Sequence, residues 1–310
     1  GKSLHRAADG DKSKNKTAFN LIEDARKDEP ANPDVHAEIG WVIAKSGSPR
    51  KGIVHVKRAI ALKPTAPSYR ILAQIKLKLD PVKYHEVEEA YQRAIMLDPS
   101  NPKYHRELAL QVYAPQKRYR DAETELSNVV SLTFGDADGY IERASIRSKR
   151  ENYDGAIQDY EAALRINSEH MGALIGLAGV FAEKEWYAKA RAQLRTAQAL
   201  EPKSVSVKAA LGNVLIKEGK YEQAVEQLSK IKAERGVDMS EVNYSLAVAK
   251  WRKKKPDASC KAQLSQVIRS NPAHFDALSL RAEVYAAEGD HTRAIADLKA
   301  GGSSPLGRIY

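Results

Sequence analysis

The side chains most able to do chemistry are the eight histidines, and none of them forms a recognisable site. No two histidines stand four residues apart, which is the spacing that lets one face of a helix hold a metal ion. The glycine-rich stretch 172–179 has the composition of a phosphate loop, but no strand precedes it. The adjacent carboxylates of Glu88 and Glu89 would point to different faces of a helix, so they cannot work as an acid–base pair. The sequence therefore predicts no catalytic residue, no metal and no cofactor, and indicates that the protein is not an enzyme.

Small residues recur along the chain at a nearly constant interval. Intervals of 33, 36, 35, 34, 34, 35 and 35 residues separate Gly40, Ala73, Ala109, Ala144, Ala178, Gly212, Ala247 and Ala282. Intervals of 35, 35, 34, 34, 34, 36 and 34 residues separate Gly52, Val87, Ala122, Ala156, Ala190, Ala224, Cys260 and Ala294. Two series in step indicate two packed helices per unit, and a helix pair that cannot bury its apolar face alone must stack on its neighbours.

Cys260 stands in the second series, where most other units carry alanine. As the only cysteine it can form neither an intramolecular disulfide nor a metal site. We interpret it as a small buried side chain, with a reactive or regulatory thiol as the alternative.

The interval 33–64 displays one unit most clearly. A first helix is predicted to begin at Pro33 or Asp34 and to end before the turn 47–49, which reads Gly-Ser-Pro. A second helix is predicted to follow and to end before Pro64, because proline cannot extend the hydrogen-bond ladder. Each unit is therefore expected to be a pair of antiparallel helices.

These units resemble the tetratricopeptide repeat, which has Leu-Gly in its first helix and Ala, an aromatic residue and Ala in its second. The matching residues are clearest at Leu211, Gly212, Gly219, Tyr221, Ala224 and Leu228, and at Ala156, Tyr160 and Ala163. The resemblance covers roughly residues 33–300 and implies an all-α fold, a right-handed superhelical solenoid of about eight to nine helix–turn–helix repeats. Arg143 and Arg281 depart from it, because each replaces the usual leucine before the small residue.

Three parts of the chain are expected. Residues 1–32 are predicted to form a degenerate or partial N-terminal repeat, residues 33–300 the solenoid of about eight repeats, and residues 301–310 a C-terminal tail or the start of a further segment. No polar capping helix follows Pro305, and the last repeat of a solenoid exposes an apolar face unless it is capped. We therefore expect a longer protein, or a partner that covers this end.

The resemblance implies that the first helices line a concave groove that holds a partner. The groove residues expected on this ground are Arg70, Gln74, Lys103, Arg106, Tyr113, Asn213, Lys217, Tyr244, Trp251 and Arg252. Tyr244 and Trp251 are expected to flank a shallow apolar strip near Gly179 and to anchor a peptide there. A groove for acidic chaperone tails is less favoured, because Glu107 stands where a second basic residue would help.

Charge adds a weaker indication about partners. The formal net charge is +10 and the pI is about 9.4, so long-range attraction favours acidic partners. Basic residues gather at 147–150 and 252–255, both at predicted helix bends. Two interpretations stay open. The first is a non-catalytic scaffold that binds a protein or peptide in the groove and supports assembly of a larger complex. The second is a basic solenoid that binds RNA or an acidic polysaccharide in an export system.

The location of the protein is left open by the sequence. No run of residues approaches the roughly 18 consecutive apolar residues that span a bilayer. A cytoplasmic location is favoured, with a periplasmic one as the alternative if the chain is a fragment of a secreted protein.

Overall fold

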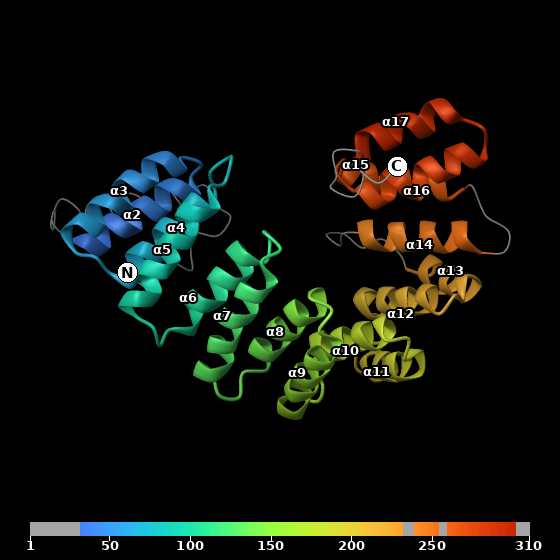
Figure 1. The fold of residues 1–310 in the computed structure, drawn as a ribbon, viewed down its shortest axis with the longest axis horizontal. Helices are drawn as coiled ribbons and strands as arrows, with labels where there is room; N and C mark the ends of the chain where they lie inside the picture. The colour runs from blue at the N-terminus through green and yellow to red at the C-terminus, as the bar shows by residue number, and fades with distance from the viewer. Residues whose placement is uncertain (1–31, 232–238, 254–258, 302–310) are drawn as a thin grey trace. The chain divides into compact units, whose positions relative to one another are not determined.

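The structure is a computed structural model that describes residues 32–231, 239–253 and 259–301, and every regular element in these ranges is helical (Figure 1). The fold is an all-α repeat solenoid, which confirms the predicted fold class. The expected degenerate repeat falls almost wholly on residues 1–31, and the expected tail on 302–310; both lie outside the described residues. The boundaries at residues 32 and 300 remain predictions. Within the described ranges, no helix is long and apolar enough to cross a membrane.

Two compact units divide the chain. Unit 1 ends at Glu151 and unit 2 begins at Asn152. The helices of unit 1 are α2 (Pro33–Lys45), α3 (Pro49–Leu62), α4 (Ala66–Lys76), α5 (Tyr84–Leu97), α6 (Pro102–Leu108), α7 (Tyr119–Leu132) and α8 (Ala137–Lys149). The helix α6 continues into a π-helical turn, η1 (Ala109–Tyr113), which the hydrogen bond of 2.9 Å from Ala114 N to Ala109 O closes.

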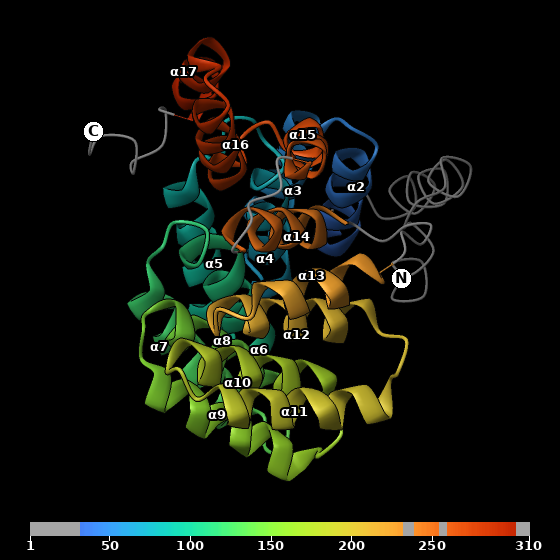
Figure 2. The ribbon, with the colours of Figure 1, turned by 90° about the vertical axis from the view of Figure 1, so that its right-hand side faces the viewer.

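The helices of unit 2 follow the same alternation of first and second helices. They are α9 (Tyr153–Ile166), α10 (Met171–Glu183), α11 (Tyr187–Leu200), α12 (Val205–Lys217), α13 (Tyr221–Ser229), α14 (Ser240–Arg252), α15 (Cys260–Ser270), α16 (Phe275–Ala287) and α17 (His291–Gly301). Four first helices, α10, α12, α14 and α16, contact one another in series, and each packs on the second helix that follows it. Figure 2 shows α10, α12 and α14 lying side by side, so they form one layer.

Local signals in the sequence set the helix ends. The side chain of Asn32 accepts a hydrogen bond of 2.9 Å from Asp34 N, and Pro33 occupies the first turn of α2, where no backbone donor is needed. The helix α3 ends at Leu62, two residues before Pro64. Proline follows the ends of α5, α11 and α15 at the same distance. The expected start and stop of each helix in the interval 33–64 are confirmed.

Every residue of the two small-residue series is buried, Cys260 included. Two helix backbones approach closely at Gly40 in α2 and Gly52 in α3. A Cβ atom added at Gly40 would come within 2.6 Å of Gly52 O, so only glycine lets these helices touch. The period seen in the sequence is therefore the period of helix–helix contact.

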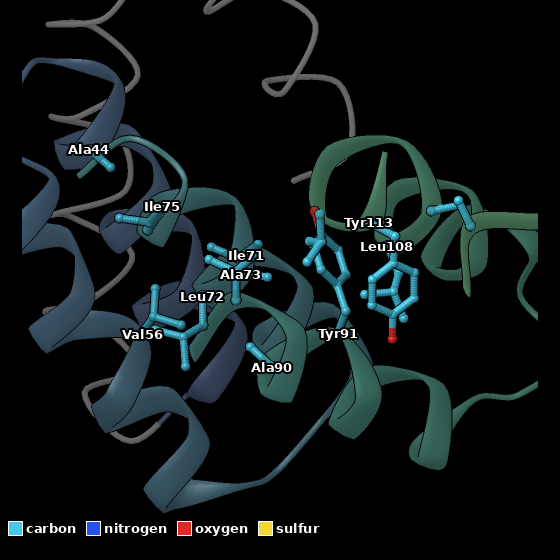
Figure 3. Close-up of a cluster of buried hydrophobic side chains, with 14 of the residues drawn as sticks. Ala44, Val56, Ile71, Leu72, Ala73, Ile75, Ala90, Tyr91, Leu108 and Tyr113 are labelled. Carbon is cyan, nitrogen blue, oxygen red and sulfur yellow. The ribbon is translucent and has the colours of Figure 1, made fainter. Parts of the chain in front are cut away.

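The core of unit 1 runs continuously through consecutive helix pairs (Figure 3). Val56, Ile75 and Tyr91 are each 0% exposed, and Leu108 is 1% exposed. Figure 3 shows Tyr91 of α5, Leu108 of α6 and Tyr113 of η1 in this one cluster. Since each helix pair buries side chains against the next one, no pair is a core on its own.

Candidate functional site

All ten predicted groove residues lie on first helices, including the π-helical continuation of α6. In unit 1, Arg70 and Gln74 of α4 both reach Glu107 of α6. The Arg70 guanidinium donates from Nε to Oε2 at 2.8 Å and from Nη2 to Oε1 at 2.6 Å, and Gln74 Nε2 adds a bond of 3.3 Å. The Arg70 and Glu107 side chains are only 16% and 11% exposed. This bidentate pair ties two neighbouring repeats together.

The same arrangement recurs one repeat later. Arg106 of α6 donates from Nε to Glu142 of α8 and from Nη2 to Asp136, both at 2.7 Å. Burial raises the pKa of the Glu142 carboxyl, and the hydrogen bond from Arg106 only partly offsets that effect. Two of the basic residues expected to face a partner are therefore already bound to carboxylates of the next repeat.

The remaining predicted residues of unit 1 differ in accessibility. Lys103 is exposed on the first turn of α6. Tyr113 is only 5% exposed, and its hydroxyl donates to Glu88 Oε1 at 3.0 Å. Burial, and then Glu88, raise the pKa of Tyr113 to about 12. Tyr113 thus contributes to the core of unit 1 and offers little surface to a ligand.

In unit 2, the first-helix layer holds the other five predicted residues. Asn213 is exposed on α12, and its side chain makes no hydrogen bond with the part of the chain that the structure describes. Lys217 Nζ lies 2.9 Å from Glu183 Oε2 on α10. Near these residues Gly179 is exposed, with open space where a Cβ atom would stand. The expectation of a shallow apolar strip flanked by Tyr244 and Trp251 stays a prediction.

A hollow of about 240 Å³ opens between α14 and α16. Its lining consists of Tyr244, Val248, Arg252, Asp276, Ser279, Leu280 and Glu283, and we call it the α14–α16 hollow. Arg252 Nη2 lies 3.1 Å from Glu283 Oε2, and Trp251 Nε1 donates to the same oxygen at 3.3 Å. The structure thus brings three predicted residues, Tyr244, Trp251 and Arg252, to one place.

The electrostatic environment of Tyr244 is negative. Burial raises the pKa of its hydroxyl, and the carboxylates of Asp276 and Glu241 raise it further. The centroid of the Tyr244 ring lies 4.9 Å from that of the His274 ring. The hydroxyl is therefore held in its neutral form, in which it can donate and accept hydrogen bonds.

A second hollow, of about 400 Å³, lies among α11, α12 and α13. Leu211 and Leu215 are among its lining residues, and its other lining side chains are mostly glutamine and arginine. Two of its charged residues are already paired, Arg191 with Glu218 and Glu226 with Lys230. It has no aromatic lining residue, so it lacks the type of side chain that most often anchors a partner.

Sequence reasoning did not predict that acidic residues of the first helices bind the predicted arginines. Glu107 and Glu142 stand 37 and 36 residues after the arginines that bind them, one repeat period plus one or two residues. That spacing is visible in the sequence and could have revealed the pairs. Asp276 and Glu283 were missed because their approach to Tyr244 and Arg252 depends on how α16 packs on α14.

Comparison with protein families decides the identity of the repeats. Two tetratricopeptide repeat family models match, one over residues 181–248 and the other over residues 141–206 and 261–305. The chain is a tetratricopeptide repeat protein. Tetratricopeptide repeats generally mediate protein–protein interactions and are generally non-catalytic.

Two curated relatives are distant in sequence and longer than this chain. RNA polymerase II-associated protein 3 of Xenopus laevis is 27% identical over an alignment of 162 residues, which covers 46% of this chain and 24% of that protein. The DnaJ homolog subfamily C member 7 homolog of Schizosaccharomyces pombe is 23% identical over an alignment of 165 residues, which covers 49% of this chain and 35% of that protein. The chain thus spans about a quarter to a third of the length of these two relatives.

A solved structure supports the fold alone. A tetratricopeptide repeat protein from Parabacteroides merdae matches with a TM-score of 0.61 and 19% identity, over 76% of this chain and 93% of that one.

Within the described ranges, no group of three or more histidine, cysteine or acidic side chains could hold a metal ion.

Proposed function

We propose that this chain is a non-catalytic scaffold whose first-helix layer in unit 2 binds a peptide or protein segment and supports assembly of a larger complex. The α14–α16 hollow is the observation that carries the proposal. It combines a half-buried tyrosine with aliphatic side chains and exposed charges, which is the composition of a protein-binding surface rather than of a catalytic site. Its volume of about 240 Å³ is below the roughly 300–1,000 Å³ of small-molecule pockets, so it suits one side chain of a partner.

The predicted groove residues divide into two roles under this proposal. Arg70 and Arg106 serve mainly to join repeats, because each is bound to a carboxylate of the following first helix. Tyr244 and Trp251 serve the partner, with Asn213 and Lys217 on the adjoining surface of α12. Arg252 lines the same hollow but is bound to Glu283 of α16, as Arg70 and Arg106 are bound to carboxylates of their following repeats. The proposal therefore moves the binding site from the whole length of the solenoid to α12, α14 and α16.

Binding of random short peptides displayed on an array tests the proposal. The chain is expected to select a subset of peptides, and the variant carrying Tyr244→Ala and Trp251→Ala should bind them at least about tenfold more weakly, because aromatic anchors dominate such interfaces. Trp186→Ala is the matched control, since Trp186 is an aromatic residue of unit 2 that is 40% exposed and lies outside the hollow. If the array yields no selective binding, or if the control weakens it equally, the proposal is wrong.

A polyanion is the second candidate ligand, and the net charge of +10 is the observation that favours it. One of the two basic clusters is partly neutralised, because Arg147 and Arg150 both bind Glu123. Titrations with single-stranded RNA and with alginate at rising salt separate the two candidates. Polyanion binding that uses several basic side chains should fall by orders of magnitude between about 50 and 200 mM salt, whereas a groove filled by apolar and aromatic groups should change far less.

A further inference from the structure

The charges that line the α14–α16 hollow have the opposite sign to the chain as a whole. The charged side chains of the lining are two carboxylates, those of Asp276 and Glu283, and one guanidinium, that of Arg252, so the lining carries a formal charge of −1. The whole chain carries +10. The net charge of the chain therefore attracts acidic partners over long range, whereas the lining of this hollow favours a basic group in direct contact.

The one cation of the lining is already engaged. Arg252 lies 3.1 Å from Glu283, which also accepts the indole hydrogen bond of Trp251. Asp276 is exposed at the first turn of α16 and forms no ion pair with the residues that the structure describes. Its charge reaches Tyr244, whose pKa is raised by burial first and then by Asp276. The hollow thus presents a carboxylate that a partner can neutralise.

The apolar part of the lining adds a second requirement. Leu280 is buried, while Tyr244 and Val248 are half-buried. Side chains that end in a charge on a long methylene stem satisfy both parts at once, because the stem packs on apolar surface while the charge stays near water. The face of a tyrosine ring also attracts cations.

We infer that the α14–α16 hollow receives a lysine or arginine side chain of the bound peptide, with its methylene stem on Tyr244, Val248 and Leu280 and its cation at Asp276. This inference rests on the proposed function, since it names the chemistry of the partner for the same site. An acidic side chain in this place would face Asp276, and Arg252 is engaged by Glu283. The carboxylate-rich peptides that the net charge favours are therefore disfavoured at this position.

The probe is an array of random short peptides in which one position is fixed as lysine, arginine, glutamate or alanine. The wild-type chain is expected to retain the lysine and arginine sets about fivefold more than the glutamate set, which corresponds to the upper end for a solvent-exposed ion pair. With Asp276→Asn, the amounts retained of the lysine, arginine and glutamate sets should differ by no more than about twofold. Asp276→Lys should reverse the order in favour of glutamate.

The matched control addresses the place of Asp276 in its helix. A carboxylate in the first turn stabilises a helix through its dipole, so Asp276→Asn could act by loosening α16. Glu222 is an exposed acidic residue in the first turn of α13, outside the hollow, and Glu222→Gln removes the same kind of charge. The Glu222→Gln variant should keep the wild-type preference for the lysine and arginine peptide sets. Circular dichroism melting checks that both variants stay folded.

Each outcome bears on the inference. Peptide binding by the wild type without a preference for lysine or arginine overturns the inference and leaves the proposed function standing. Loss of the preference in Glu222→Gln as well as in Asp276→Asn also overturns it, because the effect then belongs to net charge. No peptide binding at all overturns the proposed function and the inference together.

Discussion

Alanine in place of Gly176 should destabilise unit 2, although alanine is the better helix former. A Cβ atom at Gly176 would come within 2.6 Å of Tyr160 Oη, and closer still to two carbons of the ring. Tyr160 is 5% exposed and packed, so it cannot move away freely. Overpacking of this kind costs about 1–3 kcal/mol, whereas the change from glycine to alanine within a helix gains about 1 kcal/mol. The expected net effect is a loss of up to about 2 kcal/mol.

Gly179 provides the matched control, three residues further along α10. Apart from its chain neighbours and the backbone of its own helix, no atom lies within 4 Å of the place where its Cβ would stand. Gly179→Ala should therefore stabilise unit 2 by roughly 0.5–1 kcal/mol. Both variants gain the same helix propensity from the change of glycine to alanine. The difference between their unfolding free energies therefore measures the steric overlap with Tyr160.

Thermal melting followed by circular dichroism measures both variants. For a unit of this size, each 1 kcal/mol corresponds to a change in Tm of about 2–4 °C. Gly179→Ala should raise Tm and Gly176→Ala should lower it, and Tyr160→Leu should remove most of the cost of Gly176→Ala by taking the ring away. Equal increases in Tm for the two alanine variants would refute the packing of Tyr160 on Gly176.

Two further predictions concern ion pairs. A double-mutant cycle with Arg70→Met and Glu107→Gln, measured by urea unfolding, should give a coupling energy of about 1–3 kcal/mol, because these side chains are only 16% and 11% exposed. The same cycle on the pair Lys230–Glu226, which is 61% and 64% exposed, should give at most about 0.5 kcal/mol, and equal values would contradict the role of burial. Burial opposes ionisation of Glu123, but the hydrogen bonds from Arg147 and Arg150 outweigh it and lower the pKa of its carboxyl from 4.5. A carboxyl whose pKa is lower in the folded than in the unfolded chain contributes its full stabilisation at pH values above the unfolded-state pKa. The difference in unfolding free energy between the wild type and Glu123→Gln should therefore be constant above about pH 5.5, and it should shrink as the pH falls through the lowered pKa. A pH series of urea midpoints measures this, and an advantage that grows toward low pH would contradict it.

The helices could be predicted from the sequence because their determinants are local or strictly periodic. The turn 47–49 and Pro64 mark helix ends whatever the rest of the chain does. The small residues recur at the repeat period because each one stands where helices cross, and Gly40 and Gly52 meet there with no room for a side chain. The predicted groove residues lie on first helices for the same reason, since their register follows from the small-residue series.

The partners of charged side chains could not be predicted in the same way. Arg281 looked like a departure from the repeat pattern, because an arginine replaces a buried leucine. In the structure its guanidinium donates two hydrogen bonds of 2.7 Å to Asp297 of α17 and one of 3.0 Å to Ser265 of α15. The pair is buried, with 17% and 10% of the two side chains exposed. A pattern based on hydrophobicity does not detect this substitution, since a buried ion pair between helices takes the place of a leucine contact.

The same limit explains why net charge is a poor guide to the partner of this protein. A value of +10 sums all side chains equally, but only those that are exposed and unpaired act on a ligand at short range. Arg70 and Arg106 count in the sum, yet each is bound to a carboxylate of the next repeat. Asp276 counts against the sum, yet it is exposed at the α14–α16 hollow and forms no ion pair with the described residues, unlike Arg252 and Glu283. Charge pairing between repeats thus leaves a local surface whose sign differs from that of the chain, and specificity should follow the local sign once a partner is in contact.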